Sequence, residues 1–205
     1  MADTAATTVP DGTNTANCWA LVVCSFLALT SNIVPLITLV RVRNLAAVTL
    51  VIANEVSLFW IFLNPLIWHN DNQAAWWNGH GLCDLEVAIR TPWYTLLASA
   101  TCRLVMDLAR AVNVDNPRLF ENRTQRRRRI FFDCLFIFGI PFIQLCLHYL
   151  VQVQRYAIIA VYGCVDFLDL SWPRVVIMSM WPLLFGILNC WYSSKISLWL
   201  SADLC

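Results

Sequence analysis

Residues 18–40 form an uninterrupted stretch without a charged side chain, and this stretch constrains the fold more than any other feature. A helix needs about 20 apolar residues to cross the hydrocarbon core of a bilayer, so the stretch is long enough to span a membrane. The composition agrees, because only 13% of the 205 residues are charged, compared with about 25% in an ordinary soluble domain. We therefore expect a membrane protein and exclude a disordered chain.

Four further apolar stretches follow, at residues 45–68, 82–108, 130–150 and 175–194. The third of the five stretches is the most polar, because it carries Asp84, Glu86, Arg90, Arg103 and Asp107. We predict an all-α membrane helical bundle, residues 18–194, with five transmembrane helices. Residues 1–17 are expected to form an N-terminal tail, and residues 195–205 a short tail after the last span.

The basic residues between the spans predict the orientation, because short cytoplasmic loops of membrane proteins carry an excess of Lys and Arg. One side of the predicted bundle has ten such residues: Arg41, Arg43, Arg110, Arg118, Arg123, Arg126, Arg127, Arg128, Arg129 and Lys195. The other side has only Arg155 and Arg174. We expect the N-terminus outside the cell and the C-terminus in the cytoplasm.

The run Arg126-Arg127-Arg128-Arg129 lies between two predicted spans. A basic run can bind nucleic acid, but its position beside a membrane span and the net charge of +1 argue against a nucleic-acid partner. We interpret the run as a topology anchor that contacts anionic membrane lipid. A docking surface for a cytoplasmic partner is the alternative, and the two interpretations are compatible.

Nine cysteines are present, and most of them lie within predicted spans, where a thiol behaves as a small apolar group. Cys83 and Cys164 differ, because the predicted topology places both at the outer face, where disulfides persist. A bridge between them would hold the loop that connects the fourth and fifth spans over the mouth of the bundle. Cys18 is a competing partner for either cysteine.

Catalytic and metal-binding motifs are not evident in the sequence. His69, His80, Cys83 and Asp84 are near one another, but their spacing matches no common zinc site. The sequence has no nucleophile-elbow, zincin or phosphate-loop motif. We therefore expect no metal, no cofactor and no enzymatic activity.

Charged residues inside spans are costly and usually find a partner. Glu86 and Arg90 stand four residues apart, as do Arg103 and Asp107, so each pair can meet on one face of a helix. We expect both pairs near the two ends of the third span, in the headgroup zones. Glu55 has no local partner and is expected to make a polar contact inside the bundle.

A series of short motifs gives the chain a resemblance to a known family. In order, they are Asn64-Pro65-Leu66-Ile67-Trp68-His69-Asn70, Trp76, Gly79, Leu82-Cys83-Asp84, Tyr149-Leu150-Val151-Gln152-x-x-Arg155, Gly163-Cys164, Ser171-Trp172 and Trp181-Pro182. Together they resemble the fungal lipopeptide (a-factor-type) mating pheromone receptors, a class D group of G-protein-coupled receptors with seven spans. The resemblance covers about residues 20–192 and rests on the combination of the motifs.

The resemblance implies a plasma-membrane receptor that binds a farnesylated peptide pheromone outside and activates a heterotrimeric G protein inside. Candidate ligand-binding residues are those at the predicted outer end: Asn64, Trp68, His69, Glu86, Arg90, Tyr94 and Trp172. Candidate residues on the G-protein side are the basic ones at the inner end: Arg41, Arg43, Arg110, Arg123, Arg126, Arg127, Arg128 and Arg129.

The sequence departs from the family in one respect, because no sixth or seventh span follows Trp191-Tyr192. We expect a receptor truncated after its fifth span, and one that cannot signal, because activation by analogy involves the later helices. A second hypothesis is a non-signalling membrane partner or decoy that associates with the full-length receptor. A small transporter unit is a third hypothesis, which the lack of an inverted repeat disfavours.

Overall fold

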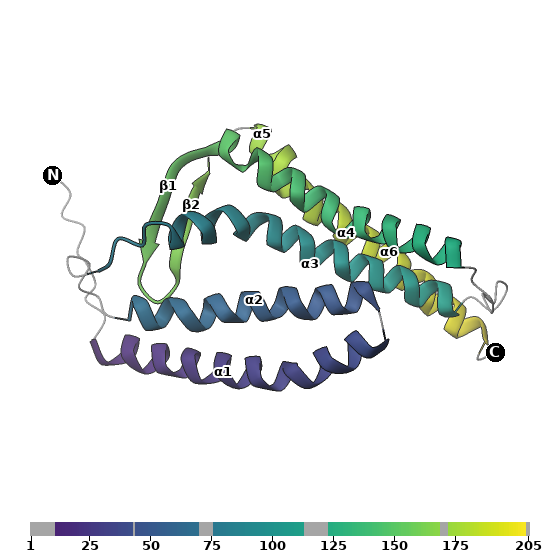
Figure 1. The fold of residues 1–205 in the computed structure, drawn as a ribbon, viewed down its shortest axis with the longest axis horizontal. Helices are drawn as coiled ribbons and strands as arrows, with labels where there is room; N and C mark the ends of the chain where they lie inside the picture. Colours follow the sequence, from purple (N-terminus) through teal and green to yellow (C-terminus); the bar gives the residue numbers. More distant parts are fainter. Residues whose placement is uncertain (1–10, 43, 70–75, 113–122, 169–171, 204–205) are drawn as a thin grey trace.

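The computed structural model describes residues 11–42, 44–69, 76–112, 123–168 and 172–203, and its elements are labelled in Figure 1. In chain order, they are α1 (Asp11–Val42), α2 (Leu45–Ile67), α3 (Leu82–Val112), α4 (Arg123–Val151), β1 (Gln152–Ile159), β2 (Gly163–Leu168), α5 (Trp172–Arg174), the π-helical turn η2 (Val175–Ser179) and α6 (Met180–Asp203). The predicted helical membrane bundle is confirmed. The first four apolar stretches coincide with α1 to α4, and the fifth, residues 175–194, covers η2 and the first part of α6.

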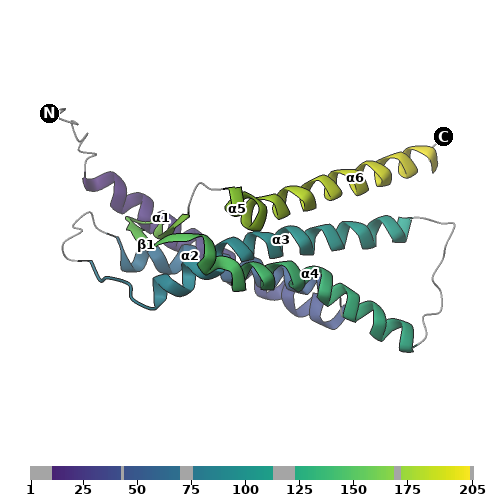
Figure 2. The same cartoon turned by 90° about the horizontal axis from the view of Figure 1, so that it is seen from above.

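Four segments of the described chain are long and apolar enough to cross a membrane: Asn17–Val42, Leu45–Ile67, Arg123–His148 and Trp172–Trp199. The helix α3 is not among them, and its position explains why. It packs against α2, α4 and α6 and lies between α4 and α6 in Figure 2. Because its neighbours cover it on several sides, α3 can bury polar residues such as Thr95 and Ser99 instead of presenting an apolar surface all round.

Small residues and hydrogen bonds to backbone carbonyls hold the centre of the bundle together. Ala53 on α2, Ala100 on α3 and Ile137 on α4 belong to one buried cluster, and small side chains let the helix backbones approach closely. Trp93 Nε1 donates a hydrogen bond to the Ala53 carbonyl at 2.8 Å, and Ser99 Oγ donates to the Ile137 carbonyl at 3.0 Å. The helix α3 is therefore fixed to α2 and α4 in mid-span.

The boundaries of the outer segments differ from those expected. The helix α1 begins at Asp11, inside the predicted tail of residues 1–17, and α6 runs to Asp203, through most of the predicted tail of residues 195–205. The short connection between α1 and α2 agrees with the sequence, since Asn44 caps α2 by accepting a hydrogen bond from the Ala47 amide at 3.2 Å.

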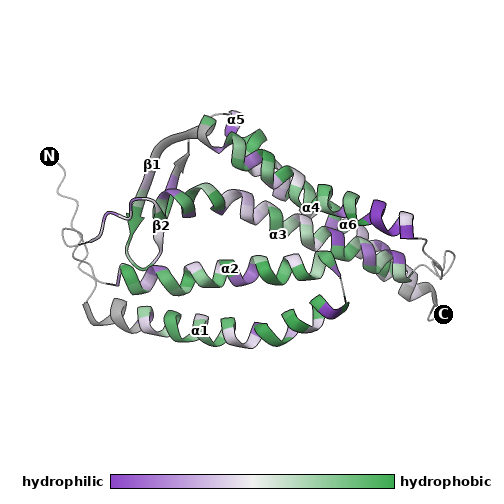
Figure 3. Cartoon of the chain, in the orientation of Figure 1, coloured by the Kyte–Doolittle hydropathy of each residue, from purple (hydrophilic) through white to green (hydrophobic). Residues whose placement is uncertain are grey.

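A two-stranded antiparallel hairpin, β1–β2, is the element that the sequence analysis did not predict. It occupies the segment expected to be a loop between the fourth and fifth spans, and Ile158 pairs with Cys164 and Ile159 with Gly163. Figure 1 shows the hairpin beside the first turns of α3 and the last turns of α2. The ends of α1 and α3 and the start of α4 lie at the opposite end, where Figure 3 shows the hydrophilic first turns of α4.

Candidate functional site

A disulfide fastens the hairpin to the start of α3. Cys83 and Cys164 are bonded, with an S–S distance of 2.03 Å and a Cα–Cα distance of 5.3 Å, and both residues are fully buried. The alternative partner suggested by the sequence, Cys18, is instead a free thiol that donates a hydrogen bond to the Pro65 carbonyl at 3.3 Å.

The turn of the hairpin is also attached to the end of α2. Asn64 Nδ2 donates hydrogen bonds to the Tyr162 carbonyl at 3.0 Å and to Glu86 Oε1 at 2.9 Å. The amide of Val161 donates to the Trp68 carbonyl at 2.9 Å. Gly163 has a φ of +88°, and a Cβ at this position would overlap the Asn64 amide. The close approach of the turn to α2 therefore requires glycine.

Beneath this turn lies a cavity of about 500 Å³ between α2 and α3, a size typical of small-molecule sites. The hairpin turn forms its outer boundary, and one residue of α1 completes the wall. Its lining residues are Leu21, Ser57, Trp60, Ile61, Asn64, Pro65, Glu86, Ile89, Arg90, Trp93, Tyr94, Ala160, Val161 and Tyr162. The walls are largely apolar and aromatic, with a small polar group at the outer end.

That polar group is an internally neutralised ion pair. Glu86 is 2% exposed and forms a salt bridge with Arg90, whose guanidinium carbon also lies 5.1 Å from the centre of the Tyr162 ring. The second carboxylate oxygen of Glu86 and the amide oxygen of Asn64 are buried, and neither has a hydrogen-bond partner among the described residues. The cavity thus has largely apolar walls and, at one end, hydrogen-bond acceptors that have no partner among the described residues.

The predicted ligand-binding residues divide into two groups. Asn64, Glu86, Arg90 and Tyr94 line the cavity together. Trp68, His69 and Trp172 are absent from its described lining. Trp68 is fully buried against the disulfide and donates its Nε1–H to the Trp77 carbonyl at 3.2 Å, so it supports the fold of this end. Trp172 is 77% exposed at the start of α5, and His69 is exposed after α2.

Several lining residues were missed, although the sequence carries a signal for them. Ser57, Trp60 and Ile61 precede Asn64 by seven, four and three residues on α2, and Ile89 and Trp93 follow Glu86 at similar spacing on α3. Residues at such intervals share one face of a helix. The spacing could therefore have identified them, whereas Ala160 and Val161 depend on the hairpin turn.

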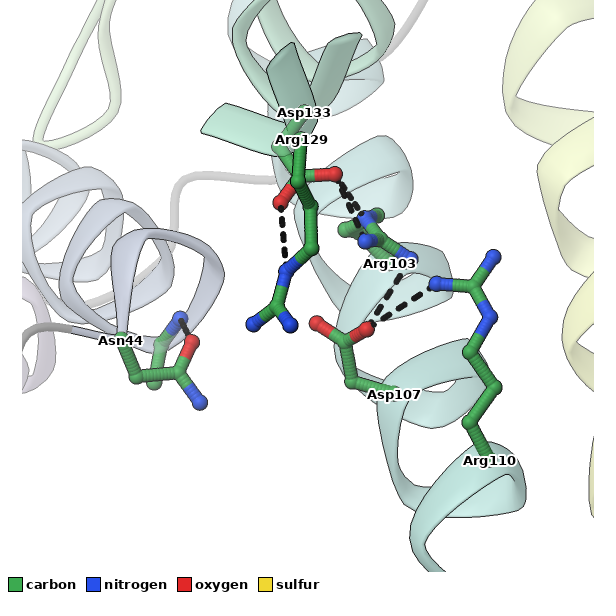
Figure 4. A network of polar contacts seen from close by, with 7 residues as sticks. Asn44, Arg103, Asp107, Arg110, Arg129 and Asp133 are labelled. Carbon is green, nitrogen blue, oxygen red and sulfur yellow. Dashed lines mark hydrogen bonds and ion pairs between the residues drawn. The ribbon is translucent and has the colours of Figure 1, made fainter. Parts of the chain in front are cut away.

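Charged residues from α3 and α4 form a network at the opposite end of the bundle, drawn in Figure 4. Arg103 is 5% exposed, and its Nε donates to Asp133 Oδ1 at 2.7 Å. The same guanidinium lies 3.0 Å from Asp107 Oδ1, the pairing within α3 that the sequence predicts. Arg110 reaches Asp107 at 3.2 Å and Arg129 reaches Asp133 at 3.9 Å. The contact with Asp133 crosses between helices and was not predicted.

The basic residues predicted for the inner side gather at this end. The described ones are all exposed: Arg41, Arg110, Arg123, Arg126, Arg127, Arg128 and Arg129. Arg43 and Arg118 lie outside the described residues. The expected interior contact of Glu55 is not formed within the described chain, since its buried Oε1 has no hydrogen-bond partner there. The described residues also contain no group of three or more His, Cys, Asp or Glu that could hold a metal ion.

Comparison with known proteins finds a match to the family described as "Pheromone A receptor", over residues 20–202. Pheromone receptor 1 of Ustilago hordei is 26% identical over 159 residues, which are 75% of this chain and 42% of that protein. The Pheromone a factor receptor of Saccharomyces cerevisiae is 22% identical over 156 residues, 75% of this chain and 32% of that protein. The Pheromone M-factor receptor of Schizosaccharomyces pombe is 26% identical over 182 residues, 84% of this chain and 46% of that protein. The chain spans less than half the length of these relatives, and no solved structure matches it.

Proposed function

The chain belongs to the Pheromone A receptor family, a family of receptors and not of enzymes, and we propose that it binds a farnesylated peptide pheromone and engages a heterotrimeric G protein. It is a multi-pass membrane protein, and the proposed location is the plasma membrane of a fungal cell. The ligand would bind at the hairpin end and the G protein at the arginine-rich end.

Two observations support the orientation in this proposal. The Cys83–Cys164 disulfide lies at the hairpin end, and disulfides persist in oxidising, extracellular surroundings. The arginines gather at the other end, as is typical of the cytoplasmic side. The hairpin end is the end of the bundle where α1 begins and α2 ends. We therefore propose that this end faces the outside of the cell.

The cavity beneath the hairpin turn is the single observation that carries the proposed ligand site. A farnesyl chain has no hydrogen-bonding groups, and its burial against Trp60, Trp93 and Ile61 is favourable by about 25 cal/mol per Å² of apolar surface. The peptide carries amide N–H donors, which match the unpartnered acceptors of Glu86 and Asn64. One end of the cavity thus suits the lipid and the other suits the peptide backbone.

The arginine-rich end suits a partner with an acidic surface, because complementary charge steers association. The helix α4 contributes the exposed side chains of Arg126 and Arg129, and α3 contributes that of Arg110. The Arg103–Asp133 pair connects α3, which lines the ligand cavity, to α4, which carries these arginines. The helix α3 is accordingly the proposed physical connection between the two sites.

Photo-crosslinking tests the ligand site directly. The full chain, carrying an N-terminal tag and held in membranes, is exposed to a synthetic farnesylated peptide with a benzophenone group, with and without excess unlabelled peptide. We expect competed labelling that maps to α2 or α3 around Trp60 and Trp93, and a reduction of about tenfold or more for Trp60→Ala, since loss of a buried aromatic contact is worth at least about 1.4 kcal/mol.

The matched control is Trp191→Ala, which removes a tryptophan that is 59% exposed on α6. An unmodified peptide of the same sequence tests the role of the lipid. Equal labelling by the farnesylated and unmodified peptides, or labelling that maps to the arginine-rich end, would contradict the proposal.

A further inference from the structure

The run of arginines at the start of α4 is divided between two faces of one helix. With 3.6 residues per turn, Arg126 lies on the face that continues through Asp133, seven residues later, and Ile137, eleven residues later. Ile137 is fully buried, so this face points into the bundle. Arg128 lies on the face that continues through Phe132 and Leu135, which are 51% and 57% exposed. Figure 3 shows that the hydrophilic turns of α4 pass directly into apolar ones.

Arg127 belongs with Arg128. The residue four positions after Arg127 is Phe131, which is 65% exposed, and the residue eleven positions after it is Phe138, which is also exposed. These phenylalanines lie in one of the membrane-spanning segments of the chain. Side chains exposed on such a segment are accessible to lipid, so Arg127 and Arg128 stand at the edge of a surface that lipid can contact.

A ring contact fixes one of these guanidinium groups on that surface. The Cζ atom of Arg128 lies 5.5 Å from the centre of the Phe132 ring, within the range of a cation–π interaction. Arginine commonly lays its aliphatic stem along apolar surface and keeps its charge at the headgroup level. The guanidinium is thus held where lipid phosphates lie in a bilayer.

The charges of Arg127 and Arg128 are not neutralised within the described chain, where neither forms an ion pair. Asp133, the acidic residue next along α4, is engaged on the other face by Arg103 and Arg129. Two adjacent positive charges on this surface are therefore available to bind a negatively charged partner. Guanidinium groups bind phosphate oxygens in a bidentate manner.

We propose that Arg127 and Arg128, together with Phe131 and Phe132, form a binding site for the headgroup of an anionic phospholipid. Arg126 and Arg129 lie on the side of α4 that carries Asp133 and are separate from this site. The lipid site goes beyond the proposed receptor function and does not depend on it, because it uses neither the ligand cavity nor Arg126 and Arg129.

The test is native mass spectrometry of the full chain in detergent, with added phosphatidylserine or phosphatidylcholine. We expect preferential binding of phosphatidylserine, lost by about thirtyfold in R127Q/R128Q, since each basic residue near an anionic surface contributes about a factor of five to affinity. The matched control R126Q/R129Q removes the same charge from the side of α4 that carries Asp133 and should change the preference by less than about twofold. R127K/R128K, which keeps the charge but loses the bidentate guanidinium geometry, should retain only part of the preference.

Helical content, measured by circular dichroism, verifies that each variant is folded. If R127Q/R128Q fails to fold, the single variants R127Q and R128Q decide, each with an expected loss of about fivefold. Equal losses in R127Q/R128Q and R126Q/R129Q would overturn the proposal, as would equal binding of the two lipids. A loss of G-protein recruitment in R127Q/R128Q with unchanged lipid preference would assign these arginines to the protein partner instead.

Discussion

Asn64 at the end of α2 donates a hydrogen bond to the carbonyl of Tyr162 in the hairpin turn at 3.0 Å, although the two residues are 98 positions apart in the chain. The same amide group donates to Glu86 on α3. One short side chain therefore connects three segments that come from distant parts of the sequence. The hairpin turn is positioned as the boundary of the cavity by these bonds and by the disulfide together.

Gly163→Ala is expected to destabilise the hairpin end, because its Cβ would overlap the Asn64 amide. Gly81→Ala is the matched control, since Gly81 also has a positive φ, of +82°, but has open space around its Cα. Both variants should lose about 1 kcal/mol of unfolding free energy to backbone strain, and Gly163→Ala should lose about 1 to 3 kcal/mol more from overpacking. Thermal unfolding in detergent measures the difference, and equal losses in the two variants would refute the steric role of Gly163.

Removal of the disulfide in Cys83→Ser/Cys164→Ser should lower the unfolding free energy by about 2 to 4 kcal/mol, because the bridge closes a long loop. The control is Cys146→Ser/Cys190→Ser, which changes two exposed free thiols and should be close to neutral. Unfolding of the purified variants under non-reducing conditions checks the prediction. A disulfide variant as stable as the control would show that the hydrogen bonds of the hairpin turn are sufficient.

Arg103→Gln should be destabilising by about 1 to 3 kcal/mol, because Asp133 and Asp107 lose their buried cation and keep only the exposed Arg129 and Arg110 as partners. Arg110→Gln removes the exposed member of the same network and should cost less than about 1 kcal/mol. The double variant R103Q/D133N should lose less than the sum of its single variants, with a coupling of about 0.5 to 3 kcal/mol. Strict additivity in this double-mutant cycle would argue against a direct interaction.

Trp93→Phe deletes the hydrogen bond to the Ala53 carbonyl while keeping most of the apolar contact between α2 and α3. We expect a loss of about 0.5 to 1.5 kcal/mol in unfolding free energy. Trp191→Phe, at an exposed position on α6, serves as the control and should be nearly silent. A similar effect of the two substitutions would mean that the indole N–H of Trp93 contributes nothing specific.

The helices were predictable because a helix that crosses a bilayer needs a long apolar stretch. Residues 18–40 and 45–68 are such stretches and can be identified from the sequence alone. The polarity of α3 was equally visible, but its central position was not, because the partner of Arg103 on α4 is 30 residues away. The hairpin was missed because Gly163 and Cys164 were interpreted as part of a loop, and its strand pairing depends on attachment to α2 and α3.

The candidate site was predictable where spacing along one helix decides proximity, as for Glu86 and Arg90. It was not predictable where exposure depends on tertiary contacts. Trp68 resembles a surface aromatic residue in the sequence, yet the disulfide and Trp77 cover it completely. The outer boundary of the cavity likewise comes from Val161 and Tyr162, whose contact with α2 is apparent only in the folded chain.

The separation of 81 residues between Cys83 and Cys164 has a consequence for the order of synthesis. Since a ribosome makes the chain from its N-terminus, α1, α2 and α3 are complete before the hairpin exists. The disulfide can therefore form only after α4 has been made and Cys164 has reached the same side of the membrane as Cys83. The hairpin turn, which forms the outer boundary of the cavity, is therefore the last part of this region to be synthesised.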